Sequence, residues 1–153
     1  MNPDNLDLIL WRHAEAEAGV IDDARALTRN GRKQAKDVAA WLRKRSIAGA
    51  VVLVSPALRA QQTAKALASR FETTAKVGSA ASARKLLAAA DWPRGRGMVI
   101  IVGHQPELGR AAALAVTGRA ADWDIKKGAL WWIRRRKGGK GIMVYAVISP
   151  DLL

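Results

Sequence analysis

The chain has 153 residues, of which half are hydrophobic and a quarter charged, a composition typical of one globular domain and not of a disordered chain. It has no cysteine, which excludes disulfides, thiolate metal ligands and a cysteine nucleophile. Its 26 Lys and Arg residues outnumber its 13 Asp and Glu residues, which favours an anionic partner: nucleic acid, a phosphorylated substrate or an acidic protein.

The first half of the chain alternates strands and helices. The apolar run "LILW" predicts a first strand that ends at Arg12 and His13. Apolar residues at helical spacing predict a helix over 29–45, with Thr28 as its N-cap. The β-branched run "AVVLVS" (50–55) predicts a strand buried on both faces, and a second helix follows over 56–70, with Pro56 at its first position.

The second half continues this order. We expect a helix over 81–92, a strand over 98–103 and a helix that begins at Pro106. Two strands, 129–136 and 142–149, flank "KGGKG", a glycine-rich connection typical of a hairpin. The order predicts one α/β domain over residues 1–153, with three layers, a mostly parallel sheet, flanking helices and a C-terminal hairpin.

Polar residues follow three of the predicted strands. Arg12 and His13 end the first strand, Ser55 ends the second with Arg59 one turn further on, and His104 ends the third. Because the carboxyl ends of parallel strands meet at one edge of a sheet, we expect these side chains to share a pocket.

Two arginines and two histidines in one pocket indicate phosphoryl chemistry. Arginine binds phosphate oxygens through a planar fork of donors, and a neutral histidine is a nucleophile or a general base. Each residue alone is explained as well by an ordinary structural role, so the joint pattern carries the hypothesis. Two histidines without neighbouring carboxylates make a poor metal site, and we expect none.

Four segments, in chain order, resemble motifs of the histidine phosphatase superfamily, which has the phosphoglycerate mutase-like fold. "LILWRHAEAE" resembles the "RHG" signature, with Ala14 in place of glycine, and "ALTRNGRKQA" resembles "LTxxGxxQA". "VLVSPALRAQQTAKAL" resembles "SPxxRAxQTA", and "VIIVGHQPELG" resembles the final "VxHxP" block. The short chain is most similar to the small phosphohistidine phosphatases of the SixA type.

The resemblance implies a role for each matching residue. His13 is expected to be the nucleophile that carries the phosphoryl group, and Arg12, Arg59 and His104 are expected to bind the phosphate oxygens. We add Ser55, at the end of its strand, to the phosphate-binding candidates. Water then hydrolyses the intermediate, and neither a metal nor an organic cofactor is expected.

The sequence departs from the family pattern at the general acid. Larger relatives place a glutamate after the "SPxxRAxQT" helix, whereas residues 75–87 contain no acidic residue. Carboxylates in the loop after His13 are alternatives, with Glu15 as our candidate acid and Glu17, Asp22 and Asp23 behind it. Without an acid, phosphate monoesters are disfavoured because their alkoxide leaving groups need a proton, whereas a phosphohistidine is disfavoured less.

We therefore predict a phosphohistidine phosphatase that acts on a phosphotransfer domain or a phosphotransferase-system carrier protein. A small-molecule phosphomonoesterase of the same fold and a non-catalytic basic module that binds phosphate or nucleic acid remain alternatives, although no nucleic-acid motif accompanies the charge. Lys126 and Lys127 are either near the site or, as we prefer, part of a surface loop. No apolar run reaches the ~18 residues of a membrane helix, and the acidic start "MNPDNLD" does not resemble a secretory signal, so we expect no membrane partner and a cytoplasmic location.

Overall fold

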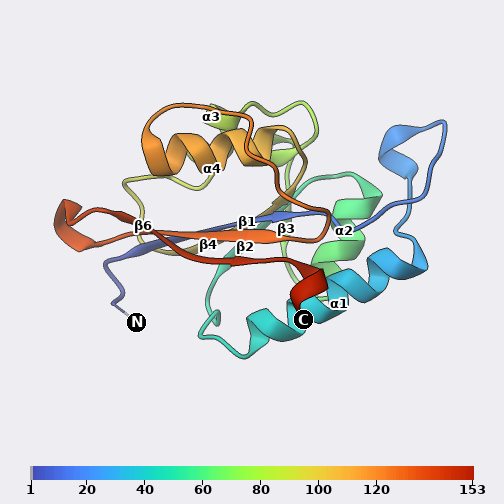
Figure 1. Cartoon of the computed structure of the whole chain (residues 1–153), viewed down its shortest axis with the longest axis horizontal. Helices are drawn as coiled ribbons and strands as arrows, with labels where there is room; N and C mark the ends of the chain where they lie inside the picture. Colours follow the sequence, from blue (N-terminus) through green and yellow to red (C-terminus); the bar gives the residue numbers. More distant parts are fainter. Residues whose placement is uncertain (1) are drawn as a thin grey trace.

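The computed structural model describes residues 2–153, and its centre is a single mixed β-sheet (Figure 1). In these residues the sheet has six strands in the order β3-β2-β4-β1-β5-β6. The strands are β1 (Leu6–Arg12), β2 (Val51–Val54), β3 (Glu72–Thr73), β4 (Gly97–Gly103), β5 (Leu130–Arg135) and β6 (Ile142–Ile148). The α-helices are α1 (Arg29–Arg43), α2 (Leu58–Lys65), α3 (Ala83–Ala89) and α4 (Glu107–Thr117).

The first four strands of the chain, β1 to β4, are parallel to one another. β1 pairs with β4, β4 with β2, and β2 with β3, all in parallel, whereas β5 and β6 form an antiparallel hairpin beside β1. Arg12 is in register with Gly103, and Val54 with Val102. Strands β1, β2 and β4 therefore end at one edge of the sheet, as the sequence predicts.

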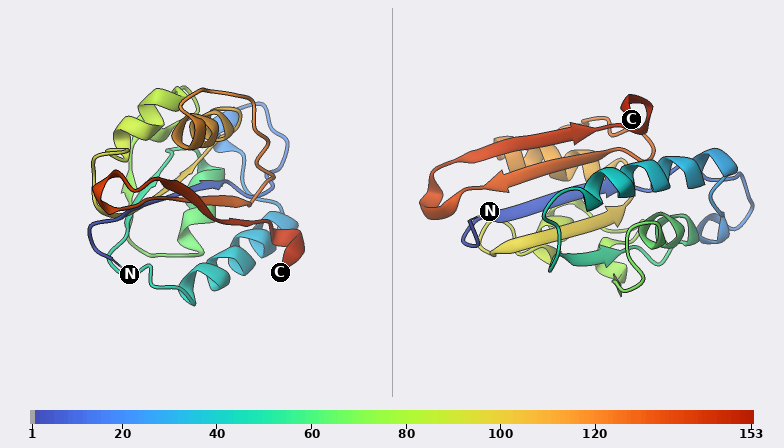
Figure 2. Two further views of the ribbon diagram at one scale, coloured as in Figure 1. Left: turned by 60° about the vertical axis from the view of Figure 1, so that its left-hand side comes forward. Right: turned by 90° about the horizontal axis from the view of Figure 1, so that it is seen from below.

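Helices cover both faces of the sheet, so the domain has the predicted three layers (Figures 1 and 2). Strand β1 contributes to the cores on both faces because successive side chains point to opposite sides. Leu8 and Leu10 pack in the core that includes α3 and α4, whereas Ile9 and Trp11 pack in the core that includes α1 and α2. No helix in the described part of the chain is long and apolar enough to cross a bilayer.

The boundaries of helices α2 and α3 differ from the predictions. Helix α2 is Leu58–Lys65 rather than 56–70, and Pro56 lies before its N-cap, Ala57. Helix α3 is Ala83–Ala89 rather than 81–92. It begins at Ala83 because the Ser82 side chain accepts a hydrogen bond from the Lys85 N–H and caps the helix there. The two-residue strand β3 was not predicted, since both of its residues are exposed and too few to form a pattern.

Candidate active site

A cavity of about 320 Å³ opens at the edge of the sheet where β1, β2 and β4 end. Strand ends supply its floor, α2 supplies one wall, and the loop after β1 supplies another. The residues that line it are Arg12, His13, Ala16, Asp22, Arg25, Arg59, Ser79, His104, Gln105 and Lys127. Both histidines of the chain and both predicted arginines therefore meet in one place.

His13 directly follows β1, and its ring is held in one tautomer. Its Nδ1 lies 2.8 Å from the carbonyl oxygen of Ala14, and because a carbonyl oxygen only accepts, Nδ1 carries the proton. Its Nε2 accepts from Nε of Arg59 at 3.4 Å, so the Nε2 lone pair faces the guanidinium. Burial lowers the pKa of His13 to about 3. The hydrogen bond to Ala14 opposes this shift, whereas the charges of His104, Arg59 and Arg12 add to it. His13 is thus neutral near pH 7, the state a nucleophile needs.

Arg59, in the first turn of α2, connects the two histidines. Its side chain is buried, with 5% of its surface exposed. Besides Nε on His13, its Nη2 lies 3.3 Å from Nδ1 of His104. Its Nη1 donates to the carbonyl oxygen of Asp22 at 2.8 Å, and Nη2 donates to Oδ2 of the same residue at 3.0 Å. A buried guanidinium is therefore aimed at the cavity, with Asp22 as its anionic partner.

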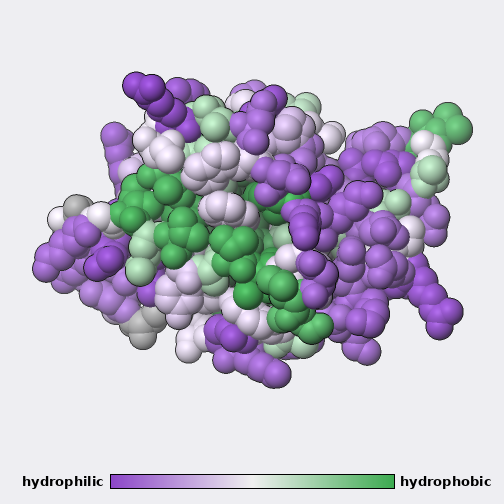
Figure 3. Space-filling view, viewed as in Figure 1, coloured by the Kyte–Doolittle hydropathy of each residue, from purple (hydrophilic) through white to green (hydrophobic). Residues whose placement is uncertain are grey.

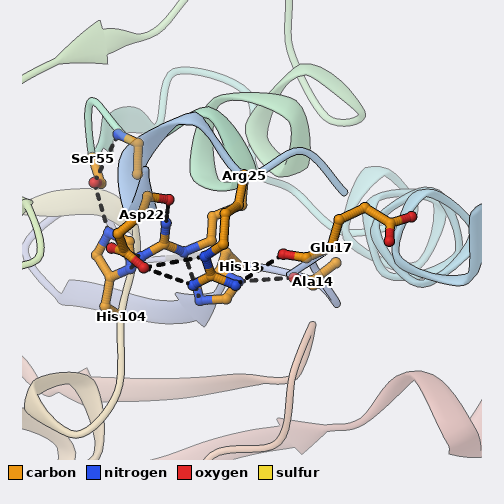
Figure 4. Close-up of polar contacts among 9 residues, drawn as sticks. His13, Ala14, Glu17, Asp22, Arg25, Ser55 and His104 are labelled. Carbon is orange, nitrogen blue, oxygen red and sulfur yellow. Dashed lines mark hydrogen bonds and ion pairs between the residues drawn. The ribbon is translucent and has the colours of Figure 1, made fainter. Parts of the chain in front are cut away.

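His104 is oriented by Arg59 on one side and by Ser55 on the other, and Figure 4 shows the contact between His104 and Ser55. A guanidinium only donates hydrogen bonds, so Nδ1 of His104 accepts from Arg59 and the ring proton is on Nε2. Nε2 therefore donates to Oγ of Ser55 at 2.7 Å. The two imidazole rings lie 5.3 Å apart between centroids. Burial and then the charge of Arg59 lower the pKa of His104 to about 4, although Asp22 and Asp23 oppose this.

Ser55 has a different place from the one we predicted. It is 1% exposed and is not among the residues that line the cavity. Its Oγ accepts from the backbone N–H of Ala57 at 3.2 Å as well as from His104. Ser55 therefore lies behind His104 and holds its ring, and does not itself line the cavity.

Arg12 lines the cavity beside His13. Its Nη1 donates to the carbonyl oxygen of Ile125 at 2.7 Å, which holds the half-buried side chain in place. Burial lowers the pKa of Arg12, and the charge of Asp124 opposes this; a guanidinium nevertheless stays protonated near neutral pH. Arg12 adds a second fixed positive charge to the cavity, and this charge helps to lower the pKa of His13.

The turn that carries His13 is held by residues from the two motifs that follow it in the sequence. Thr63 Oγ1 accepts from the Ala14 N–H at 3.0 Å, and Gln34 Oε1 accepts from the Glu15 N–H at 2.9 Å. Gly31 of α1 packs so closely that an added Cβ would lie 2.0 Å from the Glu15 carbonyl oxygen. These contacts give a physical reason for the glycine, glutamine and threonine of the motifs, which we had used only as a pattern.

The structure places Glu15, our candidate acid, outside the cavity lining. Its carboxylate accepts from Oγ1 of Thr28 at 2.8 Å and from Nδ2 of Asn30 at 3.5 Å, at the start of α1. Among the lining residues, Asp22 is the carboxylate instead. Hydrogen bonds from Arg25 and then from Arg59 lower the pKa of Asp22, so it is an anion near neutral pH and not a proton donor.

Besides Ala16, four lining residues were missed or set aside by sequence reasoning. Arg25 and Ser79 lie in loops without periodicity, which give no signal. Gln105 directly follows His104 in "GHQP", and its side chain bonds the Trp123 carbonyl oxygen and the Gly109 N–H. Lys127, which we had placed on a surface loop, lines the cavity.

In the described residues no group of three or more His, Asp or Glu side chains is arranged to hold a metal ion.

Comparisons with known proteins agree with the motifs. Residues 8–81 match the model of the histidine phosphatase superfamily (branch 1), whereas no curated protein matches the sequence. Among solved structures, the protein histidine phosphatase SixA complexed with tungstate is 24% identical, with a TM-score of 0.81 over 95% of this chain and 98% of that one.

Two further solved structures show how widely the fold is shared. A SixA protein from Nakamurella multipartitia, assigned as a phosphohistidine phosphatase, is 23% identical, with a TM-score of 0.78 over 95% and 96% of the two chains. A phosphoserine phosphatase mutant from Entamoeba histolytica in complex with phosphoserine is 16% identical, with a TM-score of 0.69 over 97% and 99%. At these identities the likeness establishes the fold of the chain.

Proposed function

We propose that this chain, which has the histidine phosphatase superfamily match over residues 8–81 and the fold of its solved members, is a phosphatase that uses His13 as its nucleophile. The observation that carries the proposal is the state of His13. Its ring is neutral, its Nδ1 proton is fixed on Ala14, and its Nε2 lone pair faces a buried arginine inside a cavity. A nucleophile and a phosphate-binding cation are therefore already in position.

The reaction has two steps. The Nε2 lone pair of His13 attacks phosphorus, a P–N bond forms, and the bond from phosphorus to the leaving group breaks. Water then attacks the phosphorus of phosphorylated His13, the P–N bond breaks, and inorganic phosphate and neutral His13 result. Arg12 and Arg59 neutralise the charge on the transferring oxygens in both steps.

His104 also changes state when a phosphoryl group binds. In the free protein its N–H is directed to Ser55, and its Nδ1 carries a lone pair. A dianion beside the ring favours the imidazolium, which gains a proton at Nδ1. His104 then donates to the phosphoryl oxygens from one nitrogen while Ser55 holds the other.

We favour phosphohistidine on a protein as the substrate. The carboxylate that lines the cavity is ionised and bound by two arginines, so no neutral acid is ready to protonate a leaving alkoxide. An imidazole leaves as a neutral group when its second nitrogen holds a proton, so this leaving group needs no acid. The cavity thus suits a phosphoramidate better than an ester.

A phosphomonoesterase is the second candidate. One observation favours it: the chain shares its fold with a phosphoserine phosphatase that was solved with phosphoserine bound. This function needs a proton for the leaving group, and Asp22 is the carboxylate among the residues that line the cavity. Hydrolysis of a monoester would therefore require Asp22 to separate from Arg25 and Arg59 and to take up a proton during each turnover.

The test compares two substrates, a phosphohistidine-bearing protein and an aryl phosphate, with wild type and His13→Ala. We expect phosphate release from the phosphohistidine protein, and the loss of that release in His13→Ala. The variant Arg94→Ala, which removes an exposed charge remote from the cavity, is the control and should keep wild-type rates. Faster turnover of the aryl phosphate would favour the monoesterase. No turnover of either substrate would favour a basic binding module.

A further inference from the structure

Residues 17–26, which we call the Asp22 loop, project from the body of the molecule beside the cavity (Figure 1). A bridge between Ala16 and Leu27 closes the base of the loop. At its tip the side chains of Val20 and Ile21 are exposed instead of packed on the body. Hydrophilic side chains cover most of the end of the molecule that carries this loop (Figure 3). Apolar packing therefore does not hold the loop over the cavity.

Polar contacts hold it instead. In the described residues, the hydrogen bonds that join the Asp22 loop to the rest of the molecule are both donated by Arg59 to Asp22, one to its carbonyl oxygen and one to its carboxylate. The remaining contacts of Asp22 are internal to the loop, since Arg25 donates to its Oδ1 from Nε at 3.1 Å and from Nη2 at 2.9 Å. The position of the loop thus depends on one buried guanidinium.

The two oxygens of Asp22 lie where a phosphoryl group would bind. A guanidinium binds two oxygens of a phosphate with parallel N–H groups, and here both terminal nitrogens of Arg59 are already used by Asp22. We propose that Asp22 is a specificity-determining residue: it occupies the oxygen-binding positions of Arg59 in the free protein, and an anion enters only by displacing it. The inference rests on the phosphoryl site of the proposed function.

Because an anion must displace Asp22 from Arg59, the site favours anions of high charge over singly charged ones. A phosphoryl dianion gains the attraction of Arg12 and Arg59 together, whereas chloride or a carboxylate carries one charge and replaces one anion by another. The same competition acts on the product, because Asp22 returns to Arg59 as inorganic phosphate leaves. The wild-type site should therefore bind free phosphate only weakly, although it is buried and positively charged.

The test measures binding of inorganic phosphate and tungstate by calorimetry, without turnover. Asp22→Asn keeps the size of the side chain and removes its charge. Asp23→Asn is the matched control: it removes the same charge one residue away, and no hydrogen bond joins Asp23 to Arg59 in the described contacts. We expect Asp22→Asn to bind phosphate about tenfold more tightly than wild type, and Asp23→Asn to change the dissociation constant by less than about twofold.

Each other outcome contradicts a defined part of the account. Equal tightening in both variants would mean that only net charge matters, and the displacement proposal would be wrong. Unchanged binding in Asp22→Asn, with binding lost in Arg59→Ala, would also overturn it while the phosphoryl site stands. No binding by any variant, Asp22→Ala included, would contradict the phosphoryl site itself and the proposed function with it.

Discussion

The cavity has two unlike sides, one built from strand ends and one from a loop. On the strand side His13 and His104 are each 8% exposed, and each ring has a hydrogen-bond partner at both nitrogens. On the loop side the Asp22 side chain is 62% exposed, and Val20 and Ile21 beside it face solvent. The rigid side holds the groups that react, and the exposed side holds the group that must move before they can react.

Arg59 contacts both sides of the cavity, and among the residues other than the nucleophile its loss should have the largest effect. Arg59→Ala removes the guanidinium that contacts His13, His104 and Asp22. We expect kcat for dephosphorylation to fall by about 10²- to 10³-fold because charge on the transferring oxygens is no longer neutralised. Steady-state kinetics with Arg94→Ala as the control variant checks this. A decrease of less than about fivefold would show that Arg59 only anchors the loop.

Ser55→Ala probes the strand side without touching the cavity lining. The variant frees the Nε2 proton of His104 and releases the ring from one of its two supports. We expect kcat to fall by about tenfold and the pH dependence of kcat to shift, because His104 no longer has a fixed tautomer. Ser55→Thr, which keeps the hydroxyl, should recover most of the rate. An unchanged pH profile in Ser55→Ala would argue against this positioning role.

The buried neutral histidines also make folding stability depend on pH. The pKa of His13 falls from 6.5 to about 3 on folding, so between these values the unfolded chain binds more protons than the folded one. The free energy of unfolding should therefore decrease as pH falls from 6.5 to 4, with a slope of at most about 1.4 kcal/mol per pH unit for each histidine. Urea unfolding of His13→Gln should show a shallower decrease, and an identical slope would contradict the buried neutral state.

Glu15→Gln should have the smallest effect. Its carboxylate is bonded to Thr28 at the start of α1 and does not line the cavity. We expect kcat to change by less than about twofold, together with a loss of stability on the order of 1 kcal/mol as the Thr28 contact weakens. Steady-state rates and thermal unfolding test both parts. A fall in kcat above tenfold would return Glu15 to the role of acid.

The same contrast explains what the sequence could predict. Arg12, His13 and His104 were placed correctly in one pocket because parallel strands end at a common edge, and apolar runs locate those ends. Ser55 ends its strand as predicted, but its hydroxyl contacts His104 and does not line the cavity, since a strand boundary does not determine which way a hydroxyl points. Sequence patterns thus predict the order of the strands and where they end, whereas they do not predict the direction of a side chain.

The loop side could not be predicted. Several carboxylates follow His13, and the one that reaches the cavity is decided by the course of a loop without periodicity. Asp22 enters because a short 3₁₀ turn at Asp22–Ala24 and the Arg25 side chain fold it back onto Arg59. The contact between Asp22 and Arg59 joins residues 37 positions apart in the sequence, and no local pattern predicts it.

The most direct test of the central claim is to trap the phosphorylated enzyme. Wild type and His13→Ala would be mixed rapidly with a phosphohistidine-bearing protein, quenched in alkali, digested and analysed by mass spectrometry. We expect a transient, alkali-stable phosphoryl group on His13 that forms and decays at rates compatible with turnover and is absent from His13→Ala. Sustained turnover with no phosphoryl group on His13, or with one on His104 instead, would contradict it.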